Sequence, residues 1–210
     1  MNTINPFSRP LYVMLKPVGA ACNLRCHYCY YLEKACLYKD SSKRVLSEEM
    51  LDQFTKEYIE AQTMNDVLFT WHGGEPLMRP LSFYRKALEL QMKYGRGRNI
   101  SNVIQTNGTL LTDEWCQFLH ENNWLVGVSI DGPQEFHDEY RRTASGGPSW
   151  AKVMRGIQLL NKHHVEWNAM AVVNDFNADY PLDFYHFFKE MGCRFIQITP
   201  VVERMVNHAD

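Results

Sequence analysis

Three closely spaced cysteines are the residues in this chain with the clearest capacity for chemistry. Cys22, Cys26 and Cys29 form a C-x3-C-x2-C pattern, which lets one tight loop surround a small inorganic group with thiolates. Soft thiolate ligands select zinc or an iron–sulfur cluster. Two other interpretations remain open from the residues alone: three structural thiols, or a zinc site that His27 or His72 completes.

A four-iron cluster accounts for the number of cysteines. Such clusters normally take four cysteine ligands, so three ligands leave one iron open to a small molecule. The loop, with Tyr28 directly before its last cysteine, resembles the signature of the radical S-adenosylmethionine (SAM) superfamily. In that family the open iron binds the amino and carboxylate groups of SAM, and reduction cleaves SAM to methionine and a 5′-deoxyadenosyl radical. The resemblance implies two cofactors, SAM and one [4Fe-4S] cluster held by Cys22, Cys26 and Cys29.

Polar clusters follow several short apolar segments that have the character of strands. They are His-Gly-Gly-Glu-Pro at 72–76, Gln-Thr-Asn-Gly at 105–108, Ser-Ile-Asp-Gly-Pro at 129–133, Val-Asn-Asp at 173–175 and Thr-Pro-Val-Val-Glu-Arg at 199–204. In parallel α/β folds the carboxyl ends of the strands meet at one edge, where the active site gathers. We therefore expect these clusters to converge. Gly73 and Gly74 would let a ligand approach bare backbone, although a Gly-Gly pair by itself is often only a turn.

Three of these clusters together resemble the anaerobic sulfatase-maturating enzymes, and the similarity runs over about residues 11–204. They are the Gly-Gly-Glu-Pro turn, the Thr-Asn-Gly turn, and the Ser-Ile-Asp-Gly-Pro turn with Tyr140 and Arg141 after it. Arg141 also fits on physical grounds, because a guanidinium suits the carboxylate or ribose oxygens of SAM. Its alternative is a surface arginine on a short helix over 135–142. The resemblance implies a SAM pocket formed by Tyr28, Gly73, Gly74, Glu75, Ser129, Arg141 and Val202.

The elements that must position these residues follow from hydrophobic periodicity. We expect strands at 11–15, 67–71, 102–105, 125–130, 167–173 and 195–198. Helices are expected to begin after the N-caps Ser47 and Thr112 and to span 81–94, 149–163 and 178–191, with Met50 on the buried face of the first. This alternation predicts an α/β fold, a parallel partial (β/α)6 barrel. The connection over 16–46, which carries the three cysteines, is unusually long for such a fold.

No linker or repeat divides the chain, so we expect residues 1–210 to form one radical SAM core domain. The resemblance implies a further SPASM-type region with auxiliary clusters and a carboxylate that acts as base. We expect this region to be absent from the chain, so the base would lie beyond Asp210. The remaining cysteines, Cys36, Cys116 and Cys193, are isolated and are expected to be ordinary thiols. His163 and His164 end a predicted helix and suit capping better than metal binding.

The implied reaction removes a hydrogen atom from Cβ of a cysteine or serine in an unfolded sulfatase motif and oxidises that residue to formylglycine. Its partners would be the sulfatase polypeptide and a low-potential electron donor such as flavodoxin or ferredoxin. Two alternatives remain: radical modification of another peptide, and a silent module that binds a cluster and SAM, or zinc.

The composition of the chain bears on which kinds of partner it can bind. The chain has 22 Lys and Arg against 24 Asp and Glu, a net charge of −2, so its overall field does not favour a polyanion and we expect no nucleic-acid partner. No apolar run approaches the roughly 18 residues needed to span a bilayer, and the first residues lack a leader pattern. Together with reduced cysteines, these features predict a cytoplasmic protein without a membrane partner.

Overall fold

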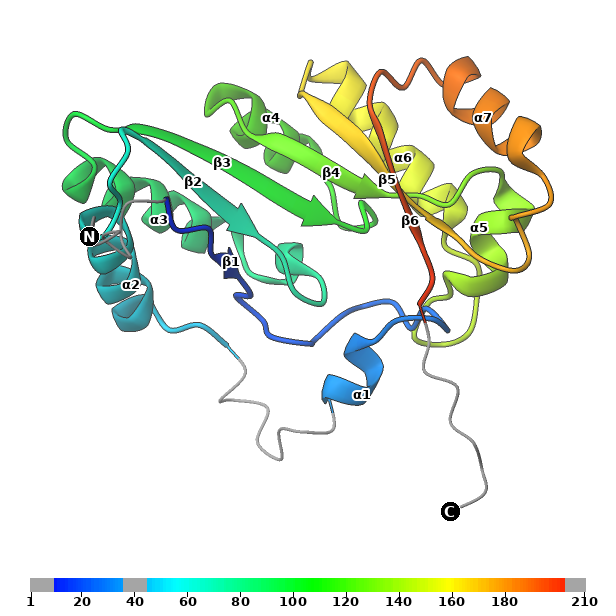
Figure 1. Ribbon diagram of the computed structural model, residues 1–210, viewed down its shortest axis with the longest axis horizontal. Coiled ribbons are helices and arrows are strands. Elements are labelled where there is room, and N and C mark those ends of the chain that lie inside the picture. The colour runs from blue at the N-terminus through cyan, green and yellow to red at the C-terminus, as the bar shows by residue number, and fades with distance from the viewer. Residues whose placement is uncertain (1–9, 36–44, 203–210) are drawn as a thin grey trace, which may run out of the picture.

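The computed structural model describes residues 10–35 and 45–202. They contain one six-stranded sheet in which every strand is parallel to its neighbours and the strand order follows the sequence, as Figure 1 shows. The strands are β1 (Met14–Leu15), β2 (Asp66–Trp71), β3 (Asn99–Thr106), β4 (Leu125–Ser129), β5 (Trp167–Val173) and β6 (Ile196–Pro200). The sheet curves without closing, which confirms the predicted partial barrel.

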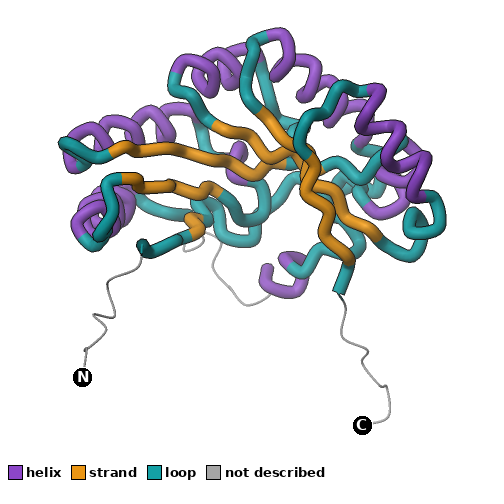
Figure 2. The backbone as a smooth tube through the Cα atoms, turned by 45° about the horizontal axis from the view of Figure 1, so that its top comes forward, coloured by secondary structure: helices purple, strands orange, loops and turns teal. Residues whose placement is uncertain are grey.

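Helices cover the outer side of the arc and leave its inner side open (Figure 2). The covering helices are α2 (Glu48–Glu60), α3 (Leu81–Tyr94), α4 (Asp113–Glu121), α5 (Gln134–Tyr140), α6 (Trp150–Lys162) and α7 (Pro181–Glu190). The short helix α1 (Tyr31–Ala35) lies on the other side, and the one-turn 3-10 helix η2 (Pro76–Met78) follows β2. None of the described helices has both the length and the apolar character needed to cross a membrane.

All six predicted strands are present, but β1 is much shorter than the predicted 11–15. The backbone of Leu11 is bound by side chains instead of by a strand: its N–H donates to Gln62 Oε1 at 3.2 Å, and its carbonyl accepts from Tyr58 Oη at 2.9 Å and Gln62 Nε2 at 3.0 Å. These contacts with α2 and with Gln62, two residues after it, replace the ladder, so the strand begins only at Met14.

The predicted helix starts are confirmed at two caps. Ser47 accepts from the N–H of Met50, and Thr112 accepts from the N–H of Trp115. The prediction for the side chain of Met50 was wrong, because it is 59% exposed while Leu51 on the same helix is fully buried. Helix α7 begins at Pro181, after the predicted residue 178, since a tight turn around Asn174 occupies the segment before it.

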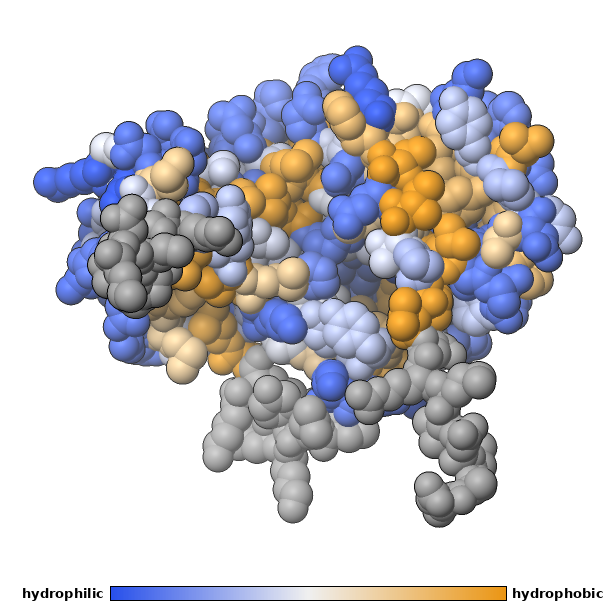
Figure 3. Space-filling model, in the orientation of Figure 1, coloured by the Kyte–Doolittle hydropathy of each residue, from blue (hydrophilic) through white to orange (hydrophobic). Residues whose placement is uncertain are grey.

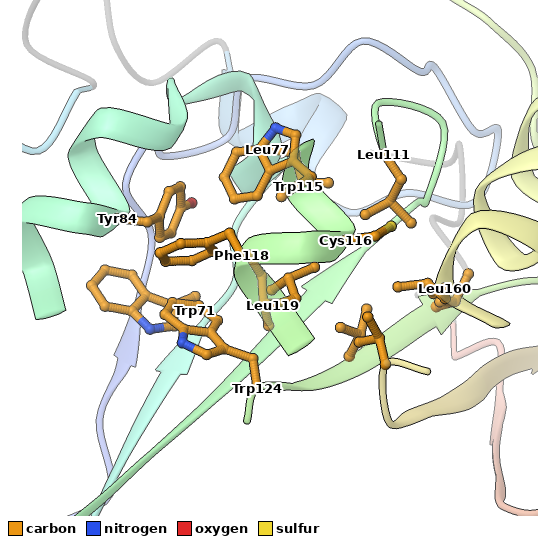
Figure 4. Packing of buried hydrophobic residues seen from close by; sticks show 14 of the residues in the cluster. Trp71, Leu77, Tyr84, Leu111, Trp115, Cys116, Phe118, Leu119, Trp124 and Leu160 are labelled. Carbon is orange, nitrogen blue, oxygen red and sulfur yellow. The ribbon is translucent and has the colours of Figure 1, made fainter. Parts of the chain in front are cut away.

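An aromatic core lies between the sheet and the outer helices. Trp71 of β2 stacks on Trp124 at a centroid distance of 6.0 Å, and Tyr84 of α3 packs edge-on against both rings (Figure 4). Cys116 is fully buried in this cluster and is an ordinary core thiol, as predicted, whereas Cys193 is half-buried and Cys36 lies outside the described residues. The core fixes the strands relative to one another, so the loops at their carboxyl ends start from defined positions.

Candidate active site

A cavity of about 350 Å³ opens at the carboxyl ends of the strands. On the face in Figure 3, polar residues lie in the central hollow and apolar residues lie on both sides of it. The cavity brings together nearly all the predicted site residues, from five separate segments of the chain. They are Cys22, Cys26, Tyr28, Cys29, Gly73, Gly74, Ser129, Arg141 and Val202. Residues 203 and 204 of the last polar cluster lie outside the described part of the chain.

The loop that carries the cysteines is held from one side by the last residue of α5 and the segment that follows it. The N–H of Arg25 donates to the carbonyl of Arg142 at 2.8 Å, and the N–H of His27 donates to the carbonyl of Tyr140 at 2.9 Å. Leu24, which lies between the first two cysteines, is buried and pairs with Thr143 in an antiparallel bridge. The loop therefore has a fixed backbone although it belongs to no long element.

The Gly-Gly turn after β2 holds the other side of this loop. The N–H of Gly74 donates to the carbonyl of Gly19 at 2.9 Å, and the N–H of Glu75 donates to the carbonyl of Ala21 at 2.8 Å. A Cβ on Gly73, whose φ is +115°, would lie 2.7 Å from the oxygen of Gly19, and one on Gly74 would lie 2.0 Å from the oxygen of Ala21. The glycines thus permit close approach of the chain itself. The sequence had suggested only the approach of a ligand.

Glu75 does not line the cavity; it lies fully buried behind the turn. Its carboxyl accepts from the N–H of Leu77 at 2.9 Å, the hydroxyl of Thr106 at 2.8 Å and the N–H of Asn107 at 2.7 Å. Burial raises the pKa of Glu75 to about 7, against the lowering effect of these three donors. In this structure Glu75 joins two turns and has no direct contact with the cavity, and its assignment to the SAM pocket remains a prediction.

A buried ion pair supports the cavity wall at Arg141. Arg141 Nε donates to Asp131 Oδ2 at 2.9 Å, and the hydroxyl of Tyr28 donates to the same oxygen. The other carboxylate oxygen of Asp131 accepts from the N–H of Val172 at 2.9 Å. Burial opposes the charge on Arg141, but the Asp131 carboxylate outweighs it and holds the pKa of the guanidinium above its usual value. Arg141 is only 7% exposed, so the alternative of a surface arginine was wrong.

The backbone of Arg141 is held by two buried side chains, His137 and Ser149. His137 Nε2 lies 3.0 Å from Ser149 Oγ, and the Ser149 hydroxyl donates to the carbonyl of Arg141 at 2.7 Å. His137 Nδ1 accepts from the N–H of Asp131 at 3.3 Å, and burial keeps the pKa of His137 well below its usual value. The imidazole is therefore neutral. It connects the backbone of Asp131, through Nδ1, to the backbone of Arg141, through Nε2 and the Ser149 hydroxyl.

Several residues in the cavity wall or directly behind it had no predicted role. Asp131 was visible only as part of a turn, and its position ten residues before Arg141 gave no sign of the ion pair. Gln105 Nε2 donates to Ser129 Oγ at 2.9 Å and so supports a predicted site residue from the neighbouring strand. Tyr31, from the unpredicted helix α1, lies with its hydroxyl 3.4 Å from Nδ1 of His72.

The three thiols fit the ligands of a cluster. All three line the cavity, and burial raises the pKa of Cys22 to about 11 and also raises that of Cys26. Binding iron would replace the thiol protons, as metal ligation by cysteine requires. Among the described residues no three His, Cys, Asp or Glu side chains meet around a single ion. In a four-iron cluster each thiolate binds a different iron, so such convergence is not needed. His163 is the C-cap residue of α6, and its Nε2 lies 2.8 Å from Asp113 Oδ1.

The curved parallel sheet with a three-cysteine loop at its carboxyl edge defines a class of enzyme, and comparison with known families gives the same class. The family model of the radical SAM superfamily matches residues 17–188, so the chain belongs to that superfamily. The predicted cofactors, one [4Fe-4S] cluster and SAM, are the cofactors of this family.

Particular relatives narrow the class. The chain is 72% identical over 209 residues to a serine-type anaerobic sulfatase-maturating enzyme of Bacteroides thetaiotaomicron, an alignment that covers 100% of this chain and 50% of the relative. It is 36% identical to a cysteine-type enzyme of Clostridium novyi, over 93% of this chain and 52% of that protein. The chain thus spans about half the length of the curated relatives it matches.

A solved structure gives the same picture. The fold superposes with a TM-score of 0.85 on native anSMEcpe with bound AdoMet and the Cp18Cys peptide, at 33% identity, over 95% of this chain and 54% of that one. The predicted fold class is therefore confirmed.

Proposed function

We propose that this chain is the radical-generating barrel of an anaerobic sulfatase-maturating enzyme. The observation that carries the proposal is the cavity, in which the three thiols, the Gly-Gly turn and the paired Arg141 line one space. Together the reduced cluster and SAM would supply a 5′-deoxyadenosyl radical that removes a hydrogen atom from the target residue. The protein's own contribution is to bind these groups and to keep the radical inside a walled cavity.

Different residues would bind the cluster and the separate parts of SAM. Cys22, Cys26 and Cys29 would hold the cluster, while the backbone at Gly73 would bind the methionyl amine. The Arg141 guanidinium, held by Asp131 at one nitrogen, has donors left for a carboxylate or ribose oxygen. Ser129, Tyr28 and Val202 line the rest of the same cavity and would complete the pocket.

We propose serine as the residue oxidised, because the relative that is 72% identical over the whole chain is serine-type. Oxidation of its CH₂OH group to an aldehyde removes one hydrogen atom, one proton and one electron. The proton requires a base, which by the resemblance lies in the SPASM-type region, outside the core domain that we propose for residues 1–210. The released electron would pass to the auxiliary clusters that the resemblance implies for the same region. The electron that reduces the radical-generating cluster would come from a flavodoxin or ferredoxin, and reduced thiols suit a cytoplasmic location.

The test uses the chain reconstituted without oxygen, given a strong reductant, SAM and a sulfatase-motif peptide with serine at the target position. We expect 5′-deoxyadenosine from the chain alone and little conversion of the peptide. A general base commonly contributes roughly 10²–10⁴-fold. Joining the chain to the second half of the 72% relative should give formylglycine, seen by mass spectrometry as loss of two hydrogens.

The matched peptide with cysteine in place of serine tests the substrate assignment. Faster conversion of the cysteine peptide by the joined protein would overturn the choice of serine. Efficient conversion by the 210-residue chain alone would overturn the assignment of the base. A loaded protein that never yields 5′-deoxyadenosine would favour the silent binding module, and product from an unrelated peptide only would favour another peptide substrate.

A further inference from the structure

The turn after β3 contains a polar residue that the proposed SAM pocket does not use. We propose that Asn107 is a positioning residue for the cluster: its side-chain amide donates an N–H···S hydrogen bond to Cys22 and thereby raises the reduction potential of the bound cluster. This inference rests on the cluster part of the proposed function and is independent of the sulfatase substrate.

The orientation of the Asn107 amide is set by its neighbours. Its Oδ1 accepts from the N–H of Thr109 at 3.0 Å, and a backbone N–H can only donate, so this atom must be the oxygen. The amide nitrogen therefore points to the other side. There it lies 2.9 Å from Asn23 Oδ1 and 3.7 Å from Cys22 Sγ. An amide nitrogen carries two hydrogens, one for each acceptor.

A closed ring of hydrogen bonds holds this arrangement. Asn107 Nδ2 donates to Asn23 Oδ1, Asn23 Nδ2 donates to Thr109 Oγ1 at 2.8 Å, and the Thr109 hydroxyl donates to Asn107 Oδ1 at 2.7 Å. Every donor in the ring meets an acceptor, so no member can reverse without breaking a contact. Asn107 and Thr109 are each more than nine-tenths buried, which removes competition from bulk water.

The backbone of Asn107 is anchored as well. Its N–H donates to Glu75 Oε2 at 2.7 Å, while Glu75 Oε1 accepts from the hydroxyl of Thr106 at 2.8 Å. The same Glu75 follows the Gly-Gly turn that holds the cysteine loop, since its N–H donates to the carbonyl of Ala21. Asn107 and the cysteine loop are therefore positioned by one buried residue, Glu75, whose carboxyl group holds Asn107 and whose backbone N–H holds the loop; this keeps the donor at its distance from Cys22.

The donor would act on the electron affinity of the cluster. Reduction adds one electron, from the low-potential donor proposed above, and makes the sulfurs more negative without forming or breaking a bond. An N–H donor stabilises the more negative state, and hydrogen bonds to sulfur are among the factors that set the potentials of iron–sulfur clusters. The backbone N–H of Leu24 also donates to Cys22 Sγ, at 3.4 Å, so Cys22 has donors from two directions.

The experiment is a redox titration of the reconstituted chain, followed by the electron paramagnetic resonance signal of the reduced cluster. Asn107→Ala removes the donor and should lower the potential, so that the ratio of reduced to oxidised cluster at a fixed potential falls up to about tenfold, which is about 59 mV for a one-electron couple. With ¹⁵N-asparagine incorporated, the wild-type spectrum should show a nitrogen coupling that Asn107→Ala loses.

Thr109→Val is the matched control. It removes one hydroxyl from the ring but keeps the Thr109 N–H that orients the amide, so its potential should stay close to that of the wild type. An equal shift in Thr109→Val and Asn107→Ala would overturn the proposal, because a loosened turn would then explain both. An unchanged potential in Asn107→Ala would overturn it directly.

A second variant keeps the test decisive if Asn107→Ala does not retain iron. Asn107→Asp keeps the acceptor for Thr109 and removes the donor, and it should lower the potential at least as much. Loss of the cluster from both variants would also overturn the proposal, since Asn107 would then be needed only for the structure of the loop. A wild-type chain that binds no cluster would overturn the cysteine assignment, which separates that failure from the failure of this inference.

Discussion

The outer face of the sheet and its carboxyl-terminal edge are held together by different interactions. On the outer face, large apolar rings such as Trp71, Tyr84 and Trp124 pack against one another and are buried almost completely. At the edge, buried polar groups such as Asp131 and Arg141 are paired through directed hydrogen bonds. Apolar burial is non-directional, whereas a buried polar group is costly unless its partner is placed correctly.

The difference separates stability from chemistry. Burying one aromatic side chain stabilises a fold by several times the net 0.5–1.5 kcal/mol or so of one hydrogen bond. The outer face therefore supplies most of the folding energy. The edge can then hold loops, glycines with positive φ and buried charges that have little stabilising effect of their own.

The largest expected effect is at the edge. Replacing Cys22, Cys26 or Cys29 with Ala should abolish the cluster, while the wild type should hold about four irons and four sulfides per chain. Iron and sulfide analysis after anaerobic reconstitution measures this. Cys116→Ala is the matched control, because Cys116 lies in the outer core, and it should retain the cluster. Zinc without sulfide in the wild type would contradict the cluster assignment.

A core substitution should have the opposite outcome. Phe118→Ala removes a ring that is 1% exposed and packs on Trp115 and Trp124, so the free energy of unfolding should fall by about 3–5 kcal/mol. Urea unfolding of the chain measures the loss. Met92→Ala, at a side chain that is 72% exposed, should change stability by less than about 0.5 kcal/mol. Equal losses in the two variants would show that the outer core is not the stabilising region.

Glu75 links the two regions and should make stability depend on pH. Its pKa is raised to about 7 in the folded chain, above the usual value of 4.5, so the folded chain binds this proton more tightly. Its contribution to the free energy of unfolding should therefore be present at low pH and fall by about 2–3 kcal/mol as pH rises from 4.5 to 7.

Unfolding of the wild type and Glu75→Gln at pH 5 and 7 tests this dependence. The amide variant cannot ionise, so it should lose less stability than the wild type over this range. The same fall in both proteins would assign the pH dependence to other groups.

The smallest expected effect concerns the planar guanidinium of Arg141. Arg141→Lys keeps the positive charge opposite Asp131 but removes the planar guanidinium, so we expect SAM binding to weaken by about 1.5 kcal/mol, roughly tenfold, with the iron content unchanged. Equilibrium binding to the loaded chain measures this. Arg155→Lys is the control, because Arg155 contacts the carbonyls of Thr109 and Leu111 and does not line the cavity. Equal affinity in Arg141→Lys and the wild type would place the SAM carboxylate or ribose elsewhere.

Particular elements show which parts of the fold could be predicted from the sequence. Alternation in β2 identified the strand directly, and the structure buries its alternate residues Val67, Phe69 and Trp71. The caps Ser47 and Thr112 were also visible, because capping depends on residues only three positions apart. The short β1 was predicted wrongly, since Leu11 is bound by Tyr58 and Gln62, which lie far along the chain. Met50, in the first turn of α2, was also predicted wrongly.

The sequence alone indicated a thiolate site, because the spacing of three cysteines within eight residues is a local property of the chain, and the resemblance of this loop to radical SAM proteins indicated the class of chemistry. It also determined the parallel α/β fold, through periodicity that repeats along the chain. Only the tertiary structure decided that Gly73 and Gly74 admit the chain's own loop, that Glu75 lies behind the cavity, that Asp131 pairs with Arg141, and that Asn107 reaches Cys22. These contacts join residues that lie on different strands and loops, and their partners are chosen by the curvature of the sheet and by burial, which no local pattern records.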